Sequence, residues 1–168
     1  MTTYPWASGA LLALALAACT TDQPGGGQPA EEQAPAHPMD AVTIETYADS
    51  LRVDLALMQR TETGLYVLDI AAGEGEPVQA GQKVKMEYTG WLPNGRRFDT
   101  SEGKQPYEFT VGRGEVIKGW DEGVLGMKLG GKRRIIVPPR LAYGDEGAGG
   151  YIPPSAVLVF DLQLVAVD

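Results

Sequence analysis

From residue 63 to residue 168, short stretches with a two-residue hydrophobic period alternate with turns rich in Gly and Pro. In KVKMEY, Val84, Met86 and Tyr88 fall on one face, and the charged residues between them fall on the other. Because successive side chains of a β-strand point to opposite faces, this alternation predicts a half-buried strand. Further predicted strands are YEFTVG (107–112), RRIIVP (133–138) and AVLVFDLQLVAV (156–167), the last of which is apolar enough to lie centrally in a sheet.

One segment of this region has a helical period instead. In GEVIKGWDEGVLGMKLG (114–130), Trp120, Val124 and Met127 are spaced i, i+4 and i+7, which places them on a narrow apolar stripe. Many short strands around one helix predict an α+β domain, in which the helix covers one face of an antiparallel sheet.

The N-terminal sequence predicts targeting rather than structure. GALLALALAAC (9–19) is an apolar run too short to span a bilayer, and it ends in Leu16-Ala17-Ala18-Cys19, which resembles the lipobox of bacterial lipoproteins. We therefore expect residues 1–18 to be a signal peptide and Cys19 to carry a lipid. The departure from the usual pattern is that no Lys or Arg precedes the apolar run. A protein of this kind would be anchored in the cell envelope, on the periplasmic face, and in the outer membrane of a diderm organism.

Two segments connect this signal to the predicted domain. Residues 19–38 are rich in Pro, Gly, Gln and acidic residues without apolar periodicity, which is typical of a flexible tether. In residues 39–62, Leu51, Leu55 and Met58 recur at helical spacing, which predicts a short helix or an arm lying on the domain. Whether this arm drives dimerisation stays open.

Composition excludes several classes of function. With 14 basic against 22 acidic residues the net charge is -8, which argues against nucleic acid as a partner. The sole cysteine excludes an internal disulfide, and the single histidine, His37, falls in the tether, so no metal site is expected. The domain has no histidine for a Ser-His-Asp or Cys-His arrangement, and no dinucleotide-binding or phosphate-binding loop, so no cofactor is expected.

Aromatic residues beside glycines and prolines predict a concave apolar pocket instead. Within GRRFDTSEG (95–103), Asp99 is either an ordinary turn residue or a carboxylate directed at such a pocket. The aromatic pairs and runs are Tyr88-Thr89-Gly90, Phe98-Asp99, Gly119-Trp120, Tyr143-Gly144 and Tyr151-Ile152-Pro153-Pro154.

Three long segments resemble the FKBP family of peptidyl-prolyl cis-trans isomerases. They are EYTGWLPNGRRFDTS (87–101), VIKGWDEGVLGMKLGGKRRIIVP (116–138) and AYGDEGAGGYIPPSAVLVFDLQL (142–164), and the resemblance runs through nearly all of residues 63–168. It implies an antiparallel sheet of five or six strands wrapped around one short helix, with a proline-binding pocket between them.

The resemblance also implies the residues of that pocket. The Trp120 indole would form the floor, the Ile117 N–H and the Tyr143 hydroxyl would hold substrate carbonyls, and Asp99 would lie at the rim. The residues implied as catalytic are Tyr88, Phe98, Asp99, Ile117, Trp120 and Tyr143. Those implied as substrate-binding are Tyr107, Phe109, Val116, Tyr151, Ile152 and Phe160. Departures from the family pattern at Tyr151 and residues 148–150 put substrate preference in doubt. Lys104 stands where the family often has an arginine, so the charge is kept but the bidentate geometry is not.

The functional hypothesis is a lipid-anchored peptidyl-prolyl cis-trans isomerase that acts on X-Pro bonds of exported proteins by desolvation and hydrogen bonding. Its expected partners are unfolded or proline-containing polypeptides, the macrolide ligands of the family and a membrane. The alternatives are a peptide-binding or chaperone module with little turnover, and a structural envelope lipoprotein that retains only the fold. The role of Asp99, electrostatic or orienting, and the oligomeric state stay open.

Overall fold

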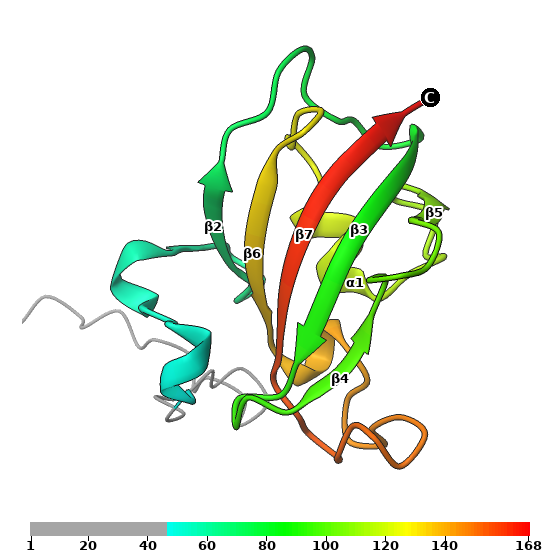
Figure 1. Cartoon of the computed structure of the whole chain (residues 1–168). Coiled ribbons are helices and arrows are strands. Elements are labelled where there is room, and N and C mark those ends of the chain that lie inside the picture. Colours follow the sequence, from blue (N-terminus) through cyan, green and yellow to red (C-terminus); the bar gives the residue numbers. More distant parts are fainter. Residues whose placement is uncertain (1–46) are drawn as a thin grey trace, which may run out of the picture. The chain divides into compact units, whose positions relative to one another are not determined.

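The computed structural model describes residues 47–168, which form a seven-stranded antiparallel sheet with one α-helix against one of its faces (Figure 1). The strand order is β1-β2-β6-β7-β3-β4, and β5 pairs with β3. The strands are β1 (Gln59–Arg60), β2 (Tyr66–Ala71), β3 (Lys83–Trp91), β4 (Arg97–Thr100), β5 (Tyr107–Thr110), β6 (Lys132–Val137) and β7 (Leu158–Val167). The expected antiparallel α+β fold is therefore confirmed. The number of strands exceeds the predicted five or six, because the two-residue β1 from the N-terminal arm pairs with β2.

Strand β7 lies centrally, as its apolar sequence predicts, because β6 pairs with one of its edges and β3 with the other. Leu158, Phe160, Leu162 and Leu164 alternate along β7 and are buried on the face that carries the helix. Val159 is also fully buried, but it belongs to a second hydrophobic cluster. Both faces of β7 are covered here, which explains why its sequence is nearly continuous in hydrophobic residues.

Helix α1 (Lys118–Gly123) is much shorter than the predicted helical segment. The predicted stripe is nevertheless buried, with Trp120, Val124 and Met127 at 5%, 0% and 3% exposure. The helix ends early because Gly126 adopts a φ of +76°, a left-handed conformation that breaks the helical repeat. Met127 therefore reaches the core from the turn that follows α1.

Two glycines let α1 approach the sheet closely. A Cβ on Gly119 would lie 2.4 Å from Val137 Cγ1, and a Cβ on Gly123 would lie 3.1 Å from Ile135 Cγ2. A side chain at residue 119 would therefore overlap Val137, and one at residue 123 would press tightly on Ile135. The glycines weaken the helix as a local structure, but they allow it to pack directly on the strand.

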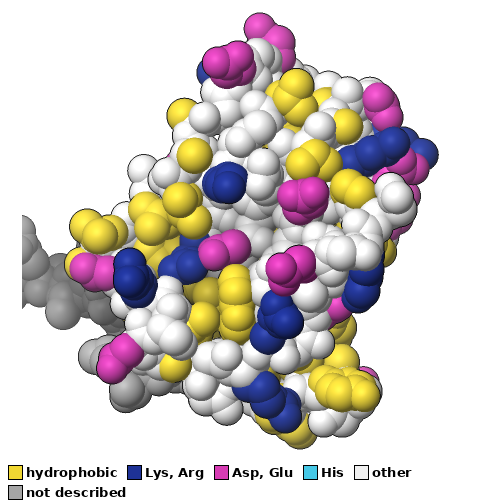
Figure 2. Space-filling model, viewed as in Figure 1, with side chains coloured by type: hydrophobic (Ala, Val, Ile, Leu, Met, Phe, Trp, Pro, Cys, Tyr) yellow, Lys and Arg dark blue, Asp and Glu magenta, His cyan; other side chains and the backbone are white. Residues whose placement is uncertain are grey.

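The part of the arm before β1 covers part of the opposite face of the sheet. Its buried residues, Leu51 and Met58, pack with Ile136, Val157 and Val159 in a second hydrophobic cluster, here named the outer cluster. Figure 2 shows that hydrophobic side chains on this face of the molecule are interspersed with both basic and acidic ones.

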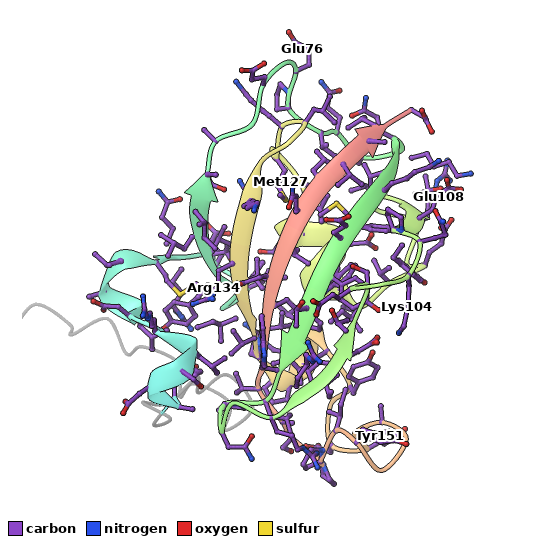
Figure 3. The ribbon with its side chains drawn as sticks, in the orientation of Figure 1. Glu76, Lys104, Glu108, Met127, Arg134 and Tyr151 are labelled. Carbon is purple, nitrogen blue, oxygen red and sulfur yellow. The ribbon has the colours of Figure 1, made fainter. Side chains whose placement is uncertain are left out.

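A polar contact reinforces the outer cluster. The Arg134 guanidinium binds the Asp161 carboxylate through two hydrogen bonds of 2.6 and 2.7 Å across the β6–β7 pair. It also donates to the backbone carbonyl of Leu51, so it lies between the sheet and the arm (Figure 3). Two parallel bonds of this kind fix the orientation of the guanidinium, which in turn fixes the arm.

The arm contains two 3-10 turns, Asp49–Leu51 and Leu55–Leu57, and no α-helix among its described residues. The helical spacing of its apolar residues is interrupted because Arg52 has a left-handed φ of 48° and Asp54 is extended. The Asp54 carboxylate instead accepts from the Ala56 N–H at 2.9 Å and caps the second turn.

The predicted signal peptide, Cys19, the tether with His37, and residues 39–46 of the arm lie outside the described residues. Within residues 47–168, no helix is long and apolar enough to cross a membrane.

Two leucines of the arm test whether the outer cluster stabilises the fold. Leu51 is 5% exposed and Leu57 is 68% exposed. Truncating a buried leucine leaves a cavity, so Leu51→Ala should lower the free energy of unfolding by about 2–3 kcal/mol. Leu57→Ala should change it by less than about 0.5 kcal/mol. Urea unfolding of both variants checks this, and equal effects would show that the arm does not contribute to the core.

Candidate active site

A cavity of about 420 Å³ lies beside α1, and the strands β3, β4, β5 and β7 contribute to its walls. Its size is typical of small-molecule and peptide pockets. Most of the predicted site residues line it: Tyr88, Phe98, Asp99, Tyr107, Val116, Ile117, Trp120, Tyr143 and Phe160. Gly114 and Glu115, which the sequence analysis did not single out, also line it.

Trp120 is the residue around which the other rings of the cavity are arranged. Its ring contacts Tyr88 edge-on, with centroids 4.9 Å apart, and Phe160 edge-on at 5.4 Å. Edge-to-face contacts of this kind are favourable beyond the area they bury. The Trp120 Nε1 atom is buried and has no hydrogen-bond partner among the described residues. The indole therefore provides an apolar floor that is held by packing.

A second ring pair depends on a glycine that sequence reasoning missed as a site residue. Phe98 and Phe160 contact each other edge-on at 5.6 Å above Gly90, which pairs with Phe160 in the β3–β7 register. A Cβ on Gly90 would lie 2.7 Å from an atom of each ring, so any other residue would displace both rings. A glycine in the interior of a strand marks a close approach of this kind, and that signal could have identified it.

The polar rim of the cavity centres on Asp99, which lies in β4 opposite Gly90 of β3. The Tyr88 hydroxyl donates to one Asp99 carboxylate oxygen at 2.6 Å, and the Thr100 N–H donates to the other at 2.8 Å. The Lys104 ammonium lies 3.6 Å from that second oxygen. Asp99 therefore lies in a strand and not in a turn, and its side chain is part of the cavity lining.

The environment of the rim tyrosines favours their neutral forms. Burial raises the pKa of the Tyr88 hydroxyl above its ordinary value, and the hydrogen bond to Asp99 raises it further. Burial likewise raises the pKa of Tyr143, and the charge of Asp99 adds to the effect. Both hydroxyls therefore stay protonated at neutral pH and can donate hydrogen bonds.

Ile117 supplies a backbone donor to the wall of the cavity. It precedes α1 as its N-cap residue, and its carbonyl accepts from the Trp120 N–H at 2.9 Å. Within the described part of the chain, the Ile117 N–H has no hydrogen-bond acceptor. A donor of this kind can donate to a ligand carbonyl oxygen without first breaking an internal hydrogen bond.

Three predicted substrate-binding residues lie outside the cavity wall. Phe109 is 1% exposed and contacts the Trp120 ring at 5.8 Å, so it supports the floor from within the core. Ile152 is buried in the same core, at 7% exposure. Tyr151 is 70% exposed, on the loop at the lower right of Figure 3. The structure does not bring these three residues to the cavity surface because two pack inward and one faces solvent.

Within the described residues, no cluster of His, Cys, Asp or Glu side chains could hold a metal ion. The cavity offers an apolar floor and aromatic walls, with hydroxyl and N–H donors at its edge. It can therefore desolvate a small apolar ring and hold adjacent carbonyl oxygens, but it provides no activated nucleophile.

The raised pKa of Tyr88 predicts a specific pH dependence of stability. In the unfolded chain a tyrosine ionises near pH 10, whereas folded Tyr88 holds its proton to higher pH, so the folded state binds more protons in that range. Its contribution is complete below about pH 10 and is lost as the pH rises further. We expect wild type to lose free energy of unfolding faster than Tyr88→Phe between about pH 9.5 and 11 in urea titrations. Parallel curves would contradict the raised pKa.

Comparisons with known proteins agree with this geometry. The chain is 49% identical over 105 residues to the FK506-binding protein of Neisseria meningitidis serogroup B, covering 62% of this chain and 96% of that protein. It is 50% identical over 91 residues to FK506-binding protein 2 of Dictyostelium discoideum, covering 54% and 68%. A solved peptidyl-prolyl cis-trans isomerase of Pseudomonas syringae superposes with a TM-score of 0.61 at 36% identity, covering 67% of this chain and 81% of that one.

The sequence model of the family described as FKBP-type peptidyl-prolyl cis-trans isomerase matches residues 74–165. That range includes every cavity-lining residue, from Tyr88 to Phe160. The chain therefore belongs to the FKBP-type peptidyl-prolyl cis-trans isomerases.

Proposed function

We propose that this isomerase acts on X-Pro bonds of exported polypeptides while a lipid on Cys19 anchors it to a membrane. The isomerase activity follows from the family. The export and the anchor are supported by the signal-like run before Cys19 and by the tether after it. The observation that supports catalysis in this cavity is its composition: aromatic walls, an apolar floor and hydrogen-bond donors at its edge.

The reaction requires rotation about a bond with partial double-bond character. The barrier is roughly 18–20 kcal/mol, and uncatalysed exchange of an X-Pro bond takes tens to hundreds of seconds. No covalent bond breaks, so neither a nucleophile nor a general base is needed. A protein that lowers the cost of losing amide resonance is sufficient.

The apolar cavity lowers that cost by desolvation. A planar amide is more dipolar than a twisted one, so transfer from water onto the Trp120 floor disfavours the ground state more than the twisted state. The neighbouring rings of Phe98 and Phe160 exclude water from the proline ring in the same way.

Hydrogen-bond donors hold the substrate during rotation. The Ile117 N–H and the Tyr143 hydroxyl are positioned to bind substrate carbonyl oxygens, and neither group has a hydrogen-bond acceptor within the described residues. Asp99 binds the Tyr88 hydroxyl and so orients this ring against Trp120. A ten-thousandfold acceleration requires about 5.4 kcal/mol, since each tenfold requires 1.36 kcal/mol. Desolvation and one or two hydrogen bonds are of that order.

FK506-like ligands should occupy the same cavity. The relatives that match this chain are named for binding FK506. Such a ligand would compete with proline-containing peptides for the Trp120 floor and for the Ile117 N–H.

Replacing the floor or the rim carboxylate tests the mechanism. In exchange NMR with Leu-Pro and Phe-Pro peptides, Trp120→Ala should lower kcat/KM by more than about a hundredfold, because it removes the desolvating surface. Asp99→Leu should lower it by about tenfold, because Tyr88 loses its orienting partner. Asp49→Leu, which changes an exposed carboxylate of the arm, is the matched control and should retain wild-type rates. Exchange no faster than in buffer, from folded wild type, would leave only a binding module.

The anchor requires a separate experiment. The full chain expressed in a diderm bacterium should incorporate a labelled fatty acid and sediment with membranes, because lipid chains partition into the bilayer. Cys19→Ser should abolish both the label and the sedimentation, whereas Thr20→Ser should retain both. A wild-type protein that is unlabelled and found in the supernatant would contradict the anchor and leave the isomerase activity unaffected.

A further inference from the structure

The loop from Tyr143 to Ser155, here named the rim loop, begins in the cavity wall and contains several glycines. Its glycines have positive φ angles: Gly144 at 58°, Gly147 at 68°, Gly149 at 55° and Gly150 at 71°. Glycine-rich backbone loses more conformational entropy on ordering than other backbone does. The rim loop therefore needs contacts that fix it in one conformation.

Some of these contacts lie within the loop. The Ser155 N–H donates to the Gly144 carbonyl at 2.8 Å, and the Ser155 hydroxyl donates to the Asp145 carboxylate, which together close its base. The Ala148 N–H donates to the Ile152 carbonyl at 2.9 Å, and the buried Ile152 side chain anchors this turn in the core. They do not join the loop to the strands on the other side of the cavity.

Arg96 makes that connection. Its guanidinium Nη2 donates to the backbone carbonyl of Tyr151, across 55 residues of sequence. A charged donor gives a stronger hydrogen bond than a neutral one. Because the acceptor is a backbone atom, the contact fixes the path of the rim loop whatever side chain residue 151 carries.

The hairpin that carries Arg96 is itself held on several sides. The Leu92 N–H donates to the Arg96 carbonyl at 2.9 Å, and Gly95 takes the positive φ of 82° that this tight turn requires. The Ala48 N–H of the arm donates to the Pro93 carbonyl at 2.8 Å. Arg96 therefore extends from a hairpin that the arm and the sheet both restrain.

We propose that Arg96 is a positioning residue for the isomerase, which acts by fixing the rim loop and with it the Tyr143 hydroxyl at the cavity. The inference rests on the isomerase activity of this cavity. Arg96 does not line the cavity, so its effect is transmitted through the loop. A loop that is ordered before binding has less entropy to lose when a peptide binds, and this strengthens binding of ground state and transition state alike. Loss of Arg96 should therefore raise KM and leave kcat nearly unchanged.

The neighbouring arginine provides a matched control. Arg97 forms an exposed ion pair with Glu102 at 3.0 Å, and no hydrogen bond or ion pair among the described residues joins it to the rim loop. Arg96→Met retains the aliphatic stem and removes the donors, Arg96→Lys retains one charged donor, and Arg97→Met removes the same charge one residue away.

Two readouts separate positioning from general stability. Arg96→Met should raise KM for a Phe-Pro peptide by about fivefold with kcat within about twofold, Arg96→Lys should fall between it and wild type, and Arg97→Met should match wild type. Hydrogen exchange of the Tyr151 and Ile152 amides, which both donate to the Ala148 carbonyl at 3.0 Å, should speed up in Arg96→Met and not in Arg97→Met.

The outcomes are distinct. An unchanged KM in Arg96→Met, with or without faster exchange of the loop amides, would overturn the proposal, and so would an equal rise in KM in Arg97→Met. A fall in kcat without a change in KM would also overturn it, because Arg96 would then act on the transition state alone. The wild-type rate, measured in the same series, checks the proposed function independently of these differences.

Discussion

The contact between α1 and strand β6 determines where the site is built. A helix of six residues is not stable by itself, so its position comes from packing rather than from its own hydrogen bonds. Gly119 and Gly123 allow the backbone of α1 to lie directly against Val137 and Ile135. That approach brings the Trp120 indole beneath the rings of β3 and β7, and the cavity above the indole follows from it. The catalytic surface is thus a consequence of how closely a helix can approach a sheet.

The sheet separates two hydrophobic clusters, one on each of its faces. The cluster on the helix side, which includes Trp120 and Phe160, is aromatic near the cavity, and the Tyr88 and Tyr143 hydroxyls lie at the edge of that cavity. The outer cluster is closed by the arm and by the Arg134–Asp161 pair. Because β6 and β7 contribute to both clusters, packing on the outer face restrains the strands that carry the site. The arm is therefore part of the structural support of the pocket.

The sequence predicted β3, β5, β6, β7 and the ring at the centre of the site, because alternation and the apolar stripe report burial directly. It did not predict β1, β2 or β4, which are short or contain no fully buried residue. It overestimated the length of α1, because hydrophobic spacing continues through Met127 while the backbone turns at Gly126. For residues 39–62 it predicted a short helix or an arm lying on the domain. The described part of this segment contains 3-10 turns and no α-helix, and its residues Leu51 and Met58 pack on one face of the sheet. Three of the predicted contact residues do not line the cavity: Phe109, Ile152 and Tyr151. A sequence motif fixes where a residue lies along a strand or loop, but it does not fix whether the side chain packs into the core or faces solvent. Gly90 was missed because it contributes no side chain to the site. The rings of Phe98 and Phe160 occupy the space in which a side chain at residue 90 would lie.

The topology of the sheet has a consequence for synthesis of the chain. Strands β1, β2 and β6 form one group, strands β3, β4 and β5 form another, and β7 is the strand that joins them. Strand β7 is also the last of these strands in chain order. A ribosome completes the two groups before it adds the strand that pairs with both, so each group then presents an unpaired edge. The nascent domain cannot close its core until residues 158–167 have emerged, so the sheet is completed in one late step.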